Sequence, residues 1–350
     1  MKLIGNILWI LISFAATVTL AATLIIPYLP PNSPLNIISS MNLVFPYALV
    51  FSIICAAVCL YRRQFYTFLW VLIILLLSIP NINKSIGLSP NATQTDKNAI
   101  TVLSYNVHFF NFFNPKQPNA LNYLKNCDAD VLCLQEVLAM QNEKETWGYL
   151  CKQLSQYKYK HVEFWYEGKR LRKGIATFSK YPIVKKDKAA IASSSHGAIS
   201  SWIKVGNDTL QVINCYLESN RLTSAEKEVY KSQEKTSLVK RIYNKLALAS
   251  QKRGAQAQKV IQLKDEKCPT LLCGDLNDVP TSYVYRTILQ DDTDTFLHLR
   301  RGIGNTFHEG IYRFRIDYIF AEESIEPLSF SIHQLNYSDH YPIELQCKLK

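Results

Sequence analysis

Six short polar segments of this sequence carry residue types that can bind a cation and move a proton. They are Ser104-Tyr105-Asn106, Leu134-Gln135-Glu136, Asn214-Cys215-Tyr216, Gly274-Asp275-Leu276-Asn277-Asp278, Arg315-Ile316-Asp317-Tyr318 and Ser338-Asp339-His340. Any one of them alone is typical of an ordinary turn, because Asn, Asp and Gly are common turn residues. Together they supply carboxylates, amides and an imidazole, which is a set suited to metal-assisted hydrolysis.

The donor types favour a hard cation. Carboxylate and amide oxygens suit Mg²⁺, which proteins hold through one or two carboxylates together with water and substrate phosphate. No Cys-x-x-Cys or His-x-x-x-His spacing indicates zinc. The sequence has neither a P-loop nor a Gly-x-Ser-x-Gly elbow, which argues against P-loop nucleotide binding and serine hydrolysis. We therefore expect a Mg²⁺ site, with Mn²⁺ as a substitute ion.

Runs of apolar and β-branched residues lie at or just before these segments, and they predict buried strands. The clearest runs are residues 100–105, 131–134, 175–178, 210–216, 270–273 and 315–320. Residues 119–127 and 143–153 fit helices between them, and residues 224–266 fit a long basic helix with a break at Gly254. Strands mixed with helices predict a layered α/β or α+β domain, whose strand ends can aim polar side chains.

The N-terminal 95 residues have a different composition. They contain no Asp or Glu, and only Lys2, Arg62, Arg63 and Lys84 are basic. Uncharged runs of about 20 residues are long enough to cross the hydrocarbon core of a bilayer. The predicted organisation is three membrane spans, or two, at about residues 7–26, 42–61 and 65–80, a linker at 81–98 and a catalytic domain at 99–350.

The basic residues predict the orientation of these spans. Lys2 precedes the first span and Arg62-Arg63 lies between the second and third, so both points are expected on the cytoplasmic side. Three spans then place the catalytic domain outside, in the periplasm if the membrane is a bacterial inner membrane. Two spans would leave it in the cytoplasm. The odd number of cysteines after residue 95 indicates small core residues more than a disulfide framework, which favours a reducing compartment.

From Ile100 to Ile343 the sequence resembles the endonuclease/exonuclease/phosphatase superfamily, the DNase-I-like hydrolases. All six polar segments occur in that family's order. Three longer stretches, at residues 128–136, 174–182 and 340–343, match as well. The resemblance implies a four-layer sandwich, in which two packed β-sheets are flanked by helices, and it implies an enzyme that hydrolyses phosphoester bonds.

The resemblance also implies a role for each matching residue. Glu136 is expected to be the main Mg²⁺ ligand, with Asn106 and Asp339 beside it. Asp275 is expected to orient or deprotonate the attacking water. The remaining expected catalytic residues are Asn277 on the phosphate, His340 facing the scissile phosphate, Asp317 orienting His340, and Tyr216 as a hydrogen-bond donor.

Tyr216 departs from the common pattern, because many members of the family carry His at this position. A phenol can donate a hydrogen bond to phosphate, but its ordinary pKa of about 10 makes it a poor acid or base near neutral pH. Tyr also occurs in the abasic-site endonuclease branch, where an Asn follows three positions later. Here Asn220 follows four positions later, so Tyr216 does not by itself assign that branch.

The family fold does not select a substrate. A basic surplus favours nucleic acid, and a nuclease-like phosphodiesterase is the leading interpretation. The membrane tether favours phospholipid or other head-group phosphoesters, because it raises the effective concentration at the bilayer. The aromatic run 109–113 could dip into lipid or pack as a loop. A catalytically inert membrane-bound binding domain is the remaining alternative, and it has no need for this set of acids and His340.

Overall fold

The computed structural model describes residues 2–30, 34–92, 96, 98–111, 120–140, 144–167, 171–191, 196–220, 235–310 and 312–350. The chain forms two compact units. The first unit comprises Met1–Ser85, Asn220–Gly254 and Val279–Arg286, and the second comprises Ile86–Ser219, Ala255–Asp278 and Thr287–Lys350.

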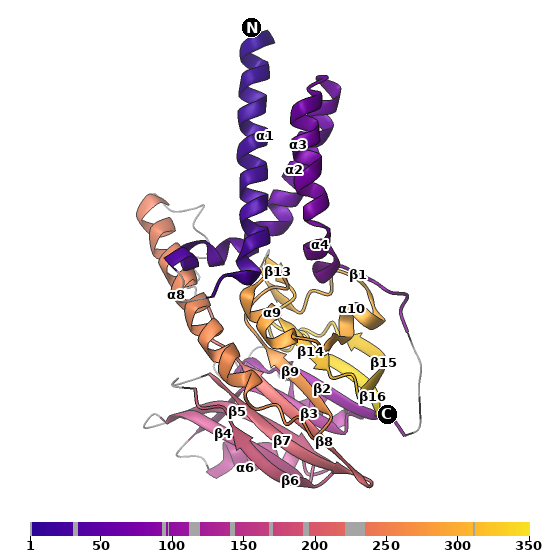
Figure 1. The fold of residues 1–350 in the computed structure, drawn as a ribbon. Helices are drawn as coiled ribbons and strands as arrows, with labels where there is room; N and C mark the ends of the chain where they lie inside the picture. The colour runs from indigo at the N-terminus through magenta and orange to yellow at the C-terminus, as the bar shows by residue number, and fades with distance from the viewer. Residues whose placement is uncertain are drawn as a thin grey trace. The chain divides into compact units, whose positions relative to one another are not determined.

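The first unit begins with apolar helices (Figure 1). Its elements are α1 (Lys2–Ile25), the 3-10 helices Ile26–Tyr28 and Pro34–Val44, α2 (Phe45–Tyr61), α3 (Phe65–Leu77) and α4 (Ile79–Ser85). Leu20, Phe45, Ala48 and Ile74 form a buried cluster that joins α1, α2 and α3. The indole N–H of Trp70 donates to Thr17 Oγ1 at 2.9 Å and also links α3 to α1.

Two of these helical segments, Ile4–Tyr28 and Ile38–Tyr61, are long and apolar enough to cross a membrane. Helices α3 and α4 meet at a bend of 46° and would together make a third span. The structure therefore has two candidate spans, or three if the bent pair counts as one. Segment 81–98, expected as a linker, contains the end of α4 and the two-residue strand β1 (Gly87–Leu88).

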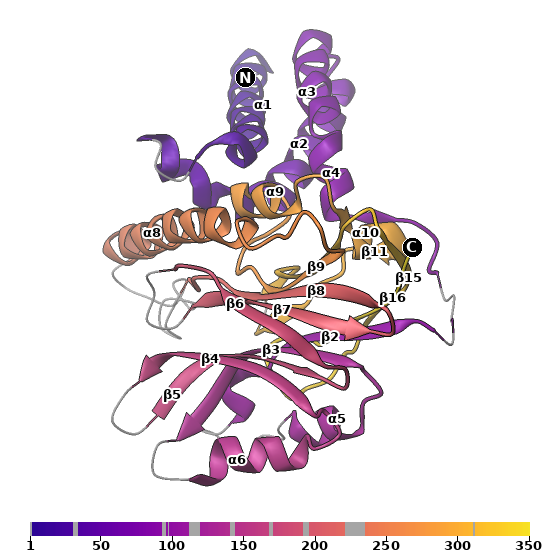
Figure 2. The same ribbon diagram turned by 60° about the horizontal axis from the view of Figure 1, so that its bottom comes forward.

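Two six-stranded sheets build the second unit, and Figure 2 shows them stacked. The first sheet has the order β15 (Ile325–Ile332), β16 (Ile343–Leu349), β2 (Ile100–Asn106), β3 (Val131–Met140), β5 (Leu171–Ser179) and β4 (Tyr159–Glu167). The second has the order β10 (Thr293–Asp294), β14 (Asp317–Ala321), β9 (Thr270–Asp275), β8 (Asp208–Tyr216), β7 (Gly197–Val205) and β6 (Ile183–Lys188). In each sheet one central pair is parallel, β2–β3 and β8–β9, and the other pairs are antiparallel.

The core lies between the inner faces of the two sheets. Val102 and Val131 from the first sheet pack with Val212, Leu271 and other residues from the second, all fully buried. Helices α5 (Leu121–Asn126) and α6 (Lys144–Gln153) cover the outer face of the first sheet, where a second apolar cluster forms (Figure 2). The structure thus has the layered sandwich that the sequence predicted, with strands that are buried on both faces in the middle of each sheet.

Several smaller elements complete the two units. They are the segment His108–Asn111, α8 (Lys235–Ile261), α9 (Tyr283–Leu289), α10 (Thr295–Leu299), the pair β1–β11 (Arg301–Gly302) and the hairpin β12 (Phe307–Glu309)–β13 (Tyr312–Phe314). The expected helix break at Gly254 is wrong, because α8 runs through this residue without interruption. Glycine inside a helix costs only about 1 kcal/mol relative to alanine, and Gly254 is buried where its helix packs. Residues 224–234 of the predicted helix lie outside the described residues.

The cysteines are small buried or partly buried side chains, as the sequence indicated. All nine are free thiols, and Cys133, Cys215, Cys273 and Cys347 belong to the strands of the core. Burial raises the pKa of the Cys347 thiol to about 12, so this group stays protonated and unreactive.

Candidate functional site

The predicted polar residues meet at the carboxyl ends of the two parallel strand pairs. In the first sheet, Asn106 ends β2 and pairs with Gln135, the residue before Glu136. In the second sheet, Tyr216 ends β8 and pairs with Asp275, which ends β9. Because both strands of a parallel pair end at the same edge, four polar side chains from four distant segments come together there.

Glu136 has a backbone conformation that a non-glycine residue seldom adopts. Its φ is 54°, in the left-handed region, and the pairing of β3 with β5 shifts register between Leu134 and Val137. Such a bulge bends a strand and re-aims a side chain, and the left-handed conformation costs about 1–2 kcal/mol. A strained residue held by well-paired neighbours is a reason to look for a function at that position.

The carboxylate of Glu136 is fixed by two hydrogen bonds. Tyr216 donates its phenol to Oε1 at 2.6 Å, and the amide of Asn106 donates to the same oxygen at 3.3 Å. In the part of the chain that the structure describes, both bonds fall on Oε1, which leaves Oε2 for another ligand. Asn106 Nδ2 also donates to Asp275 Oδ2 at 3.0 Å, so one amide links the carboxylates of the two sheets.

The turn that follows β9 fixes the position of the Asp275 carboxylate. Gly274 has a φ of 137°, and a Cβ at this position would lie 2.0 Å from the carbonyl oxygen of Cys215, so only glycine fits. Asn277 donates its backbone N–H to Asp275 Oδ1 at 2.8 Å and its side-chain amide to Oδ2 at 3.2 Å. The same amide donates to the carbonyl of Leu217 at 2.9 Å. The turn therefore presents a fixed, buried carboxylate.

Burial dominates the electrostatics of Asp275. Burial raises the pKa of this carboxyl to about 7. The charge of His340 lowers this pKa, and the charge of Asp317 raises it. A carboxyl whose pKa lies near neutrality can both accept and return a proton at physiological pH.

His340 and Asp317 form a buried pair. His340 Nδ1 lies 2.9 Å from Asp317 Oδ2, and its Nε2 lies 3.8 Å from Asp275 Oδ2. Burial alone would lower the pKa of His340, but the charges of Asp317 and Asp275 outweigh it and hold this pKa well above its usual value. Thr306 supports the pair, because its Oγ1 accepts the backbone N–H of Asp317 at 3.1 Å. The arrangement is an oriented imidazolium beside a carboxylate.

Asp339, the third residue expected at the metal, is ion-paired. His108 Nδ1 lies 3.2 Å from Asp339 Oδ1, and Ser338 Oγ donates to the carbonyl oxygen of Asn106 at 2.8 Å, which ties this loop to β2. Burial would raise the pKa of Asp339, but the hydrogen bond from His108 and the charge of His340 outweigh it and hold the pKa well below its usual range. Asp339 is thus an anion at every physiological pH.

Two donor sets in the site fit a divalent cation. One is the predicted set around Glu136, where a carboxylate oxygen is open and Asp339 is ionised. The other is Asp275, Asp317 and His340, whose ligand atoms lie within 4.8 Å of one another and are all buried. In the second set Nδ1 of His340 is engaged with Asp317, and a protonated imidazole repels a cation. The set around Glu136 consists of oxygen donors, which a hard cation prefers, and its role as the cation site stays a prediction.

The side-chain amide of Asn106 is not oriented as a cation ligand would be. Its amide NH₂ faces Glu136 and Asp275, and its Oδ1 accepts the backbone N–H of His108 at 3.1 Å. In this arrangement Asn106 bridges two carboxylates as a donor. Ligation of a cation would need the amide oxygen turned toward Glu136, so that role stays a prediction.

A buried polar bridge holds the two halves of the site together. Gln135 of β3 donates to Asn214 Oδ1 of β8 at 2.8 Å and to Ser104 Oγ at 3.1 Å. Asn214 in turn donates to the carbonyl oxygen of Ala176 at 3.1 Å. These residues lie between the sheets with full burial, where hydrogen bonds to the amides are needed; the Oε1 of Gln135 has no hydrogen-bond partner among the described residues. The bridge joins β3 to β8 beside Glu136 and Tyr216.

Sequence reasoning missed two residues next to the site. His196 and Glu218 are both buried, and the ring of His196 packs against that of Tyr216. Glu218 lies two positions after Tyr216, and this closeness along the chain is the sequence feature that could have indicated a place near the site. Nothing in the residues around His196 indicates that it reaches this strand end.

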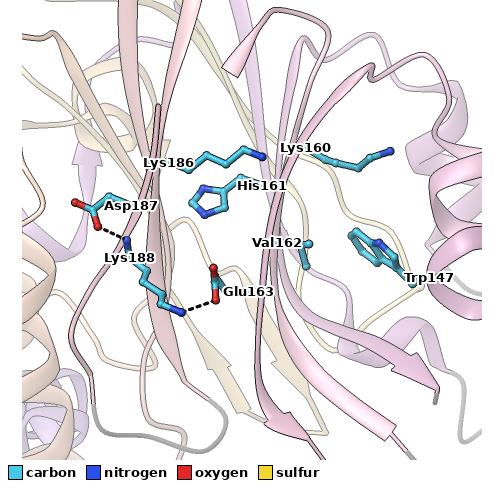
Figure 3. A pocket seen from close by; sticks show the side chains of 8 residues that line it. All are labelled: Trp147, Lys160, His161, Val162, Glu163, Lys186, Asp187 and Lys188. Atoms are coloured by element: carbon cyan, nitrogen blue, oxygen red, sulfur yellow. Dashed lines mark hydrogen bonds and ion pairs between the residues drawn. The ribbon is translucent and has the colours of Figure 1, made fainter. Parts of the chain in front are cut away.

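A separate groove lies away from these residues. It has a volume of about 620 Å³ and is lined by Trp147, Lys160, His161, Val162, Glu163, Lys186, Asp187 and Lys188 (Figure 3). These residues come from α6 and from the edge strands β4 and β6, and Lys188 pairs with Glu163 at 2.8 Å. None of the predicted catalytic or metal residues lines the groove.

His161 in this groove leads to a prediction about stability. Burial lowers its pKa to about 4, so the folded chain binds no proton there between about pH 4 and 6.5, whereas the unfolded chain does. Stability should therefore fall as the pH drops from 6.5 to 4, by about 3 kcal/mol from this residue. Urea unfolding of wild type and His161→Gln at pH 7 and pH 5 should show a weaker pH dependence in the variant. The exposed His298→Gln is the matched control, and equal pH dependence in all three proteins would contradict the prediction.

The aromatic run after Asn106 is only partly described. Phe109 and Phe110 belong to a segment, His108–Asn111, whose four residues all have positive φ values between 43° and 55°. Lys173 Nζ lies 4.4 Å from the centre of the Phe109 ring. Phe112 and Phe113 lie outside the described residues, so lipid contact by the whole run stays a prediction.

The sequence is similar to one family of known proteins. The profile of the Endonuclease/Exonuclease/phosphatase family matches residues 103–340, about two thirds of the chain. No curated protein matches the sequence significantly. Members of the family generally use a divalent metal ion.

Solved structures show the same fold at low sequence identity. An endonuclease/exonuclease/phosphatase family protein from Leptotrichia buccalis is 18% identical, and the match covers 72% of this chain and all of that one with a TM-score of 0.53. The endonuclease/exonuclease/phosphatase from Bacteroides vulgatus is 16% identical over 72% of this chain and 99% of its own, also with a TM-score of 0.53. The protein from Beutenbergia cavernae is 16% identical over 72% of each chain with a TM-score of 0.54. The chain belongs to the endonuclease/exonuclease/phosphatase family and is a hydrolase of phosphoester bonds.

Proposed function

We propose that this protein is a membrane-anchored, Mg²⁺-dependent phosphodiesterase, with nucleic acid as the leading substrate class. One observation carries the proposal. Glu136 from one sheet and Asp275 from the other are joined through a single amide, beside the buried pair of His340 and Asp317. This geometry combines a cation-binding carboxylate, a proton-accepting carboxylate and a cationic donor, which are the groups that phosphoester hydrolysis needs.

Each residue of the site has a separate role in the proposed hydrolysis. Glu136, with Asp339, would hold the cation, which when bound polarises the phosphoryl oxygens. Asp275 orients the attacking water and takes its proton, while Asn277 keeps that carboxylate in place and would donate to the phosphate. His340 places positive charge beside the phosphoryl oxygens, and Asp317 holds the proton on the side of Nδ1. Tyr216 orients Glu136 with its phenol.

The proposed anchor consists of the N-terminal helices, with three spans and the catalytic domain on the non-cytoplasmic side. The structure supports one element of this arrangement. Arg62, in the turn between α2 and α3, donates to Asn6 Oδ1 near the N-terminal end of α1 at 2.8 Å. Lys2 and Arg62-Arg63 therefore lie at the same end of this helical unit, where positive charge is retained on the cytoplasmic side. In a bacterial inner membrane the catalytic domain would face the periplasm.

Phospholipid or other head-group phosphoesters are the second candidate substrates. The candidate spans Ile4–Tyr28 and Ile38–Tyr61 favour them, because a tether concentrates the site at the bilayer. The basic surplus after residue 95, with 35 Lys and Arg against 28 Asp and Glu, favours nucleic acid instead. The third alternative, an inert binding domain, does not explain why buried ionisable groups are collected around Asp275.

One experiment separates these functions. The full-length chain in detergent micelles is offered supercoiled plasmid and, separately, mixed micelles of phospholipid, with Mg²⁺ or with EDTA, and His340→Ala is the control. Plasmid nicking that requires Mg²⁺ and His340 is the expected result. Release of head groups without nicking would assign the lipid substrate, and no hydrolysis of either would contradict the proposed function.

A further inference from the structure

A buried histidine and a buried glutamate stand directly behind Tyr216. The ring of His196 packs against that of Tyr216 in a tilted arrangement, with centroids 4.7 Å apart and an angle of 37° between the planes. Its Nδ1 lies 3.0 Å from Glu218 Oε2, and both side chains are almost fully buried. His196 precedes Gly197, which pairs with Tyr216 across β7 and β8. The pair is thus anchored at the same strand end as the predicted catalytic residues.

Hydrogen bonds fix the ring of His196 and hold the backbone of Glu218 in place. The N–H of Ser219 donates to His196 Nε2 at 3.4 Å, so the other nitrogen, Nδ1, carries the proton and donates it to Glu218. The N–H of Glu218 donates to Gln256 Oε1 at 2.8 Å. Both ring nitrogens are therefore engaged, and the plane of the imidazole cannot turn without breaking a buried hydrogen bond.

Tyr216 is consequently held on two sides. Ile175, Ile199 and Trp165 pack around its ring in one small cluster, while His196, the residue before β7, packs against the ring. At the other end, the phenol donates to Glu136 Oε1 at 2.6 Å. A short path of direct contacts therefore runs from Glu218 through His196 and Tyr216 to Glu136.

The burial of the Glu218 carboxylate together with His196 is energetically costly. Taking two ionisable groups out of water carries a desolvation cost, and such a pair seldom adds net stability relative to apolar residues of similar size. Residues that orient a ligand of a metal, without touching the metal, commonly change metal affinity or activity by about 10–100-fold. Orientation of Tyr216 is the role that the contacts of this pair support.

We propose that His196 and Glu218 are positioning residues of the hydrolytic site, which hold Tyr216 so that its hydroxyl aims the Glu136 carboxylate at a divalent cation. The proposal rests on the proposed function only through the assignment of Glu136 as a cation ligand. It makes Tyr216 part of a four-residue arrangement in this chain, so that the phenol orients a ligand rather than transfers a proton.

A double-mutant cycle tests the inference on the full-length chain in detergent. Calorimetric titration with Mg²⁺ gives the dissociation constant, and hydrolysis of a chromogenic phosphodiester gives kcat and KM. His196→Ala and Tyr216→Phe are each expected to weaken Mg²⁺ binding about tenfold and to lower kcat with little change in KM. The double variant should bind Mg²⁺ within about twofold of Tyr216→Phe, because His196 acts only through the phenol.

Controls separate positioning from folding. His161→Ala removes an equally buried histidine, bonded to Ser201 at 3.0 Å, and should lower the melting temperature without changing Mg²⁺ affinity. Glu218→Gln keeps a hydrogen-bond acceptor for His196 and should bind Mg²⁺ within about threefold of wild type, whereas Glu218→Ala should match His196→Ala. If His196→Ala does not fold, Glu218→Ala takes its place in the cycle with Tyr216→Phe.

The outcomes distinguish the two proposals. Unchanged Mg²⁺ affinity in His196→Ala, or effects of His196→Ala and Tyr216→Phe that simply add in the double variant, would overturn the positioning role and leave the proposed function intact. A wild-type chain that neither binds Mg²⁺ nor hydrolyses the diester would overturn both.

Discussion

Replacement of Glu136 by glutamine is expected to lower kcat for phosphodiester hydrolysis by about a thousandfold and to weaken Mg²⁺ binding. The substitution keeps the shape of the side chain and an oxygen for the bond from Tyr216, but it removes the charge that attracts a cation. Metal polarisation of a phosphoryl group contributes several kcal/mol, and about 4 kcal/mol corresponds to a thousandfold change in rate. Initial rates over a range of Mg²⁺ concentrations measure both effects.

Glu163→Gln is the matched control for this variant. Glu163 lies on β4, pairs with Lys188 in the groove of Figure 3, and is outside the predicted site. Its replacement should leave the rate and the Mg²⁺ dependence within about twofold of wild type, because exposed ion pairs contribute at most about 1 kcal/mol. A Glu136→Gln variant that behaves like this control would show that Glu136 is not the cation ligand and would favour the second donor set.

Replacement of His340 by asparagine is the second change with a large expected effect. The imidazole is buried and its pKa is held well above the usual value by Asp317 and Asp275, in spite of burial, so it carries positive charge at neutral pH. Asparagine retains a polar side chain but loses that charge. We expect kcat to fall by about 10²–10⁴-fold, while Mg²⁺ affinity changes little because His340 is not a ligand in the preferred set.

His333→Asn provides the comparison for His340. His333 follows β15, lies 3.4 Å from Glu344 and donates its backbone N–H to the carbonyl oxygen of Pro342, and these contacts involve no predicted site residue. This variant should retain full activity. Separate measurement of kcat and of the Mg²⁺ dissociation constant is decisive: if His340→Asn lost Mg²⁺ binding in proportion to kcat, His340 would be a ligand and the set of Asp275, Asp317 and His340 would hold the cation.

Most of the architecture could be predicted from the sequence because its signals are local. The apolar runs before Asn106, Glu136, Tyr216 and Asp275 form strands β2, β3, β8 and β9, and the family resemblance gave the layered sandwich that the structure shows. Edge strands such as β6 were not predicted, because its pattern Ile-Val-Lys-Lys-Asp-Lys has mostly exposed residues. An exposed strand is determined by hydrogen bonding to its neighbour, here β7, rather than by an apolar pattern of its own.

The predicted site residues also come together as expected, although their roles stay predictions. The resemblance selected Glu136, Asp275, Asp317 and His340, and the distances show that they share one site. The resemblance could not show which way the amide of Asn106 points. That orientation depends on the N–H of His108 and on two carboxylates from different strands.

By itself the sequence determined the apolar N-terminal segments, the hydrolase family, the core strands and the residues that can do chemistry. It did so because composition, period-two patterns and motif order are properties of neighbouring residues. Only the tertiary structure decided the strained backbone of Glu136, the pairing of His108 with Asp339, and the contact of His196 with Tyr216 and Glu218. These features arise where the ends of separate strands converge, and their energies depend on burial and on partners that are distant along the chain.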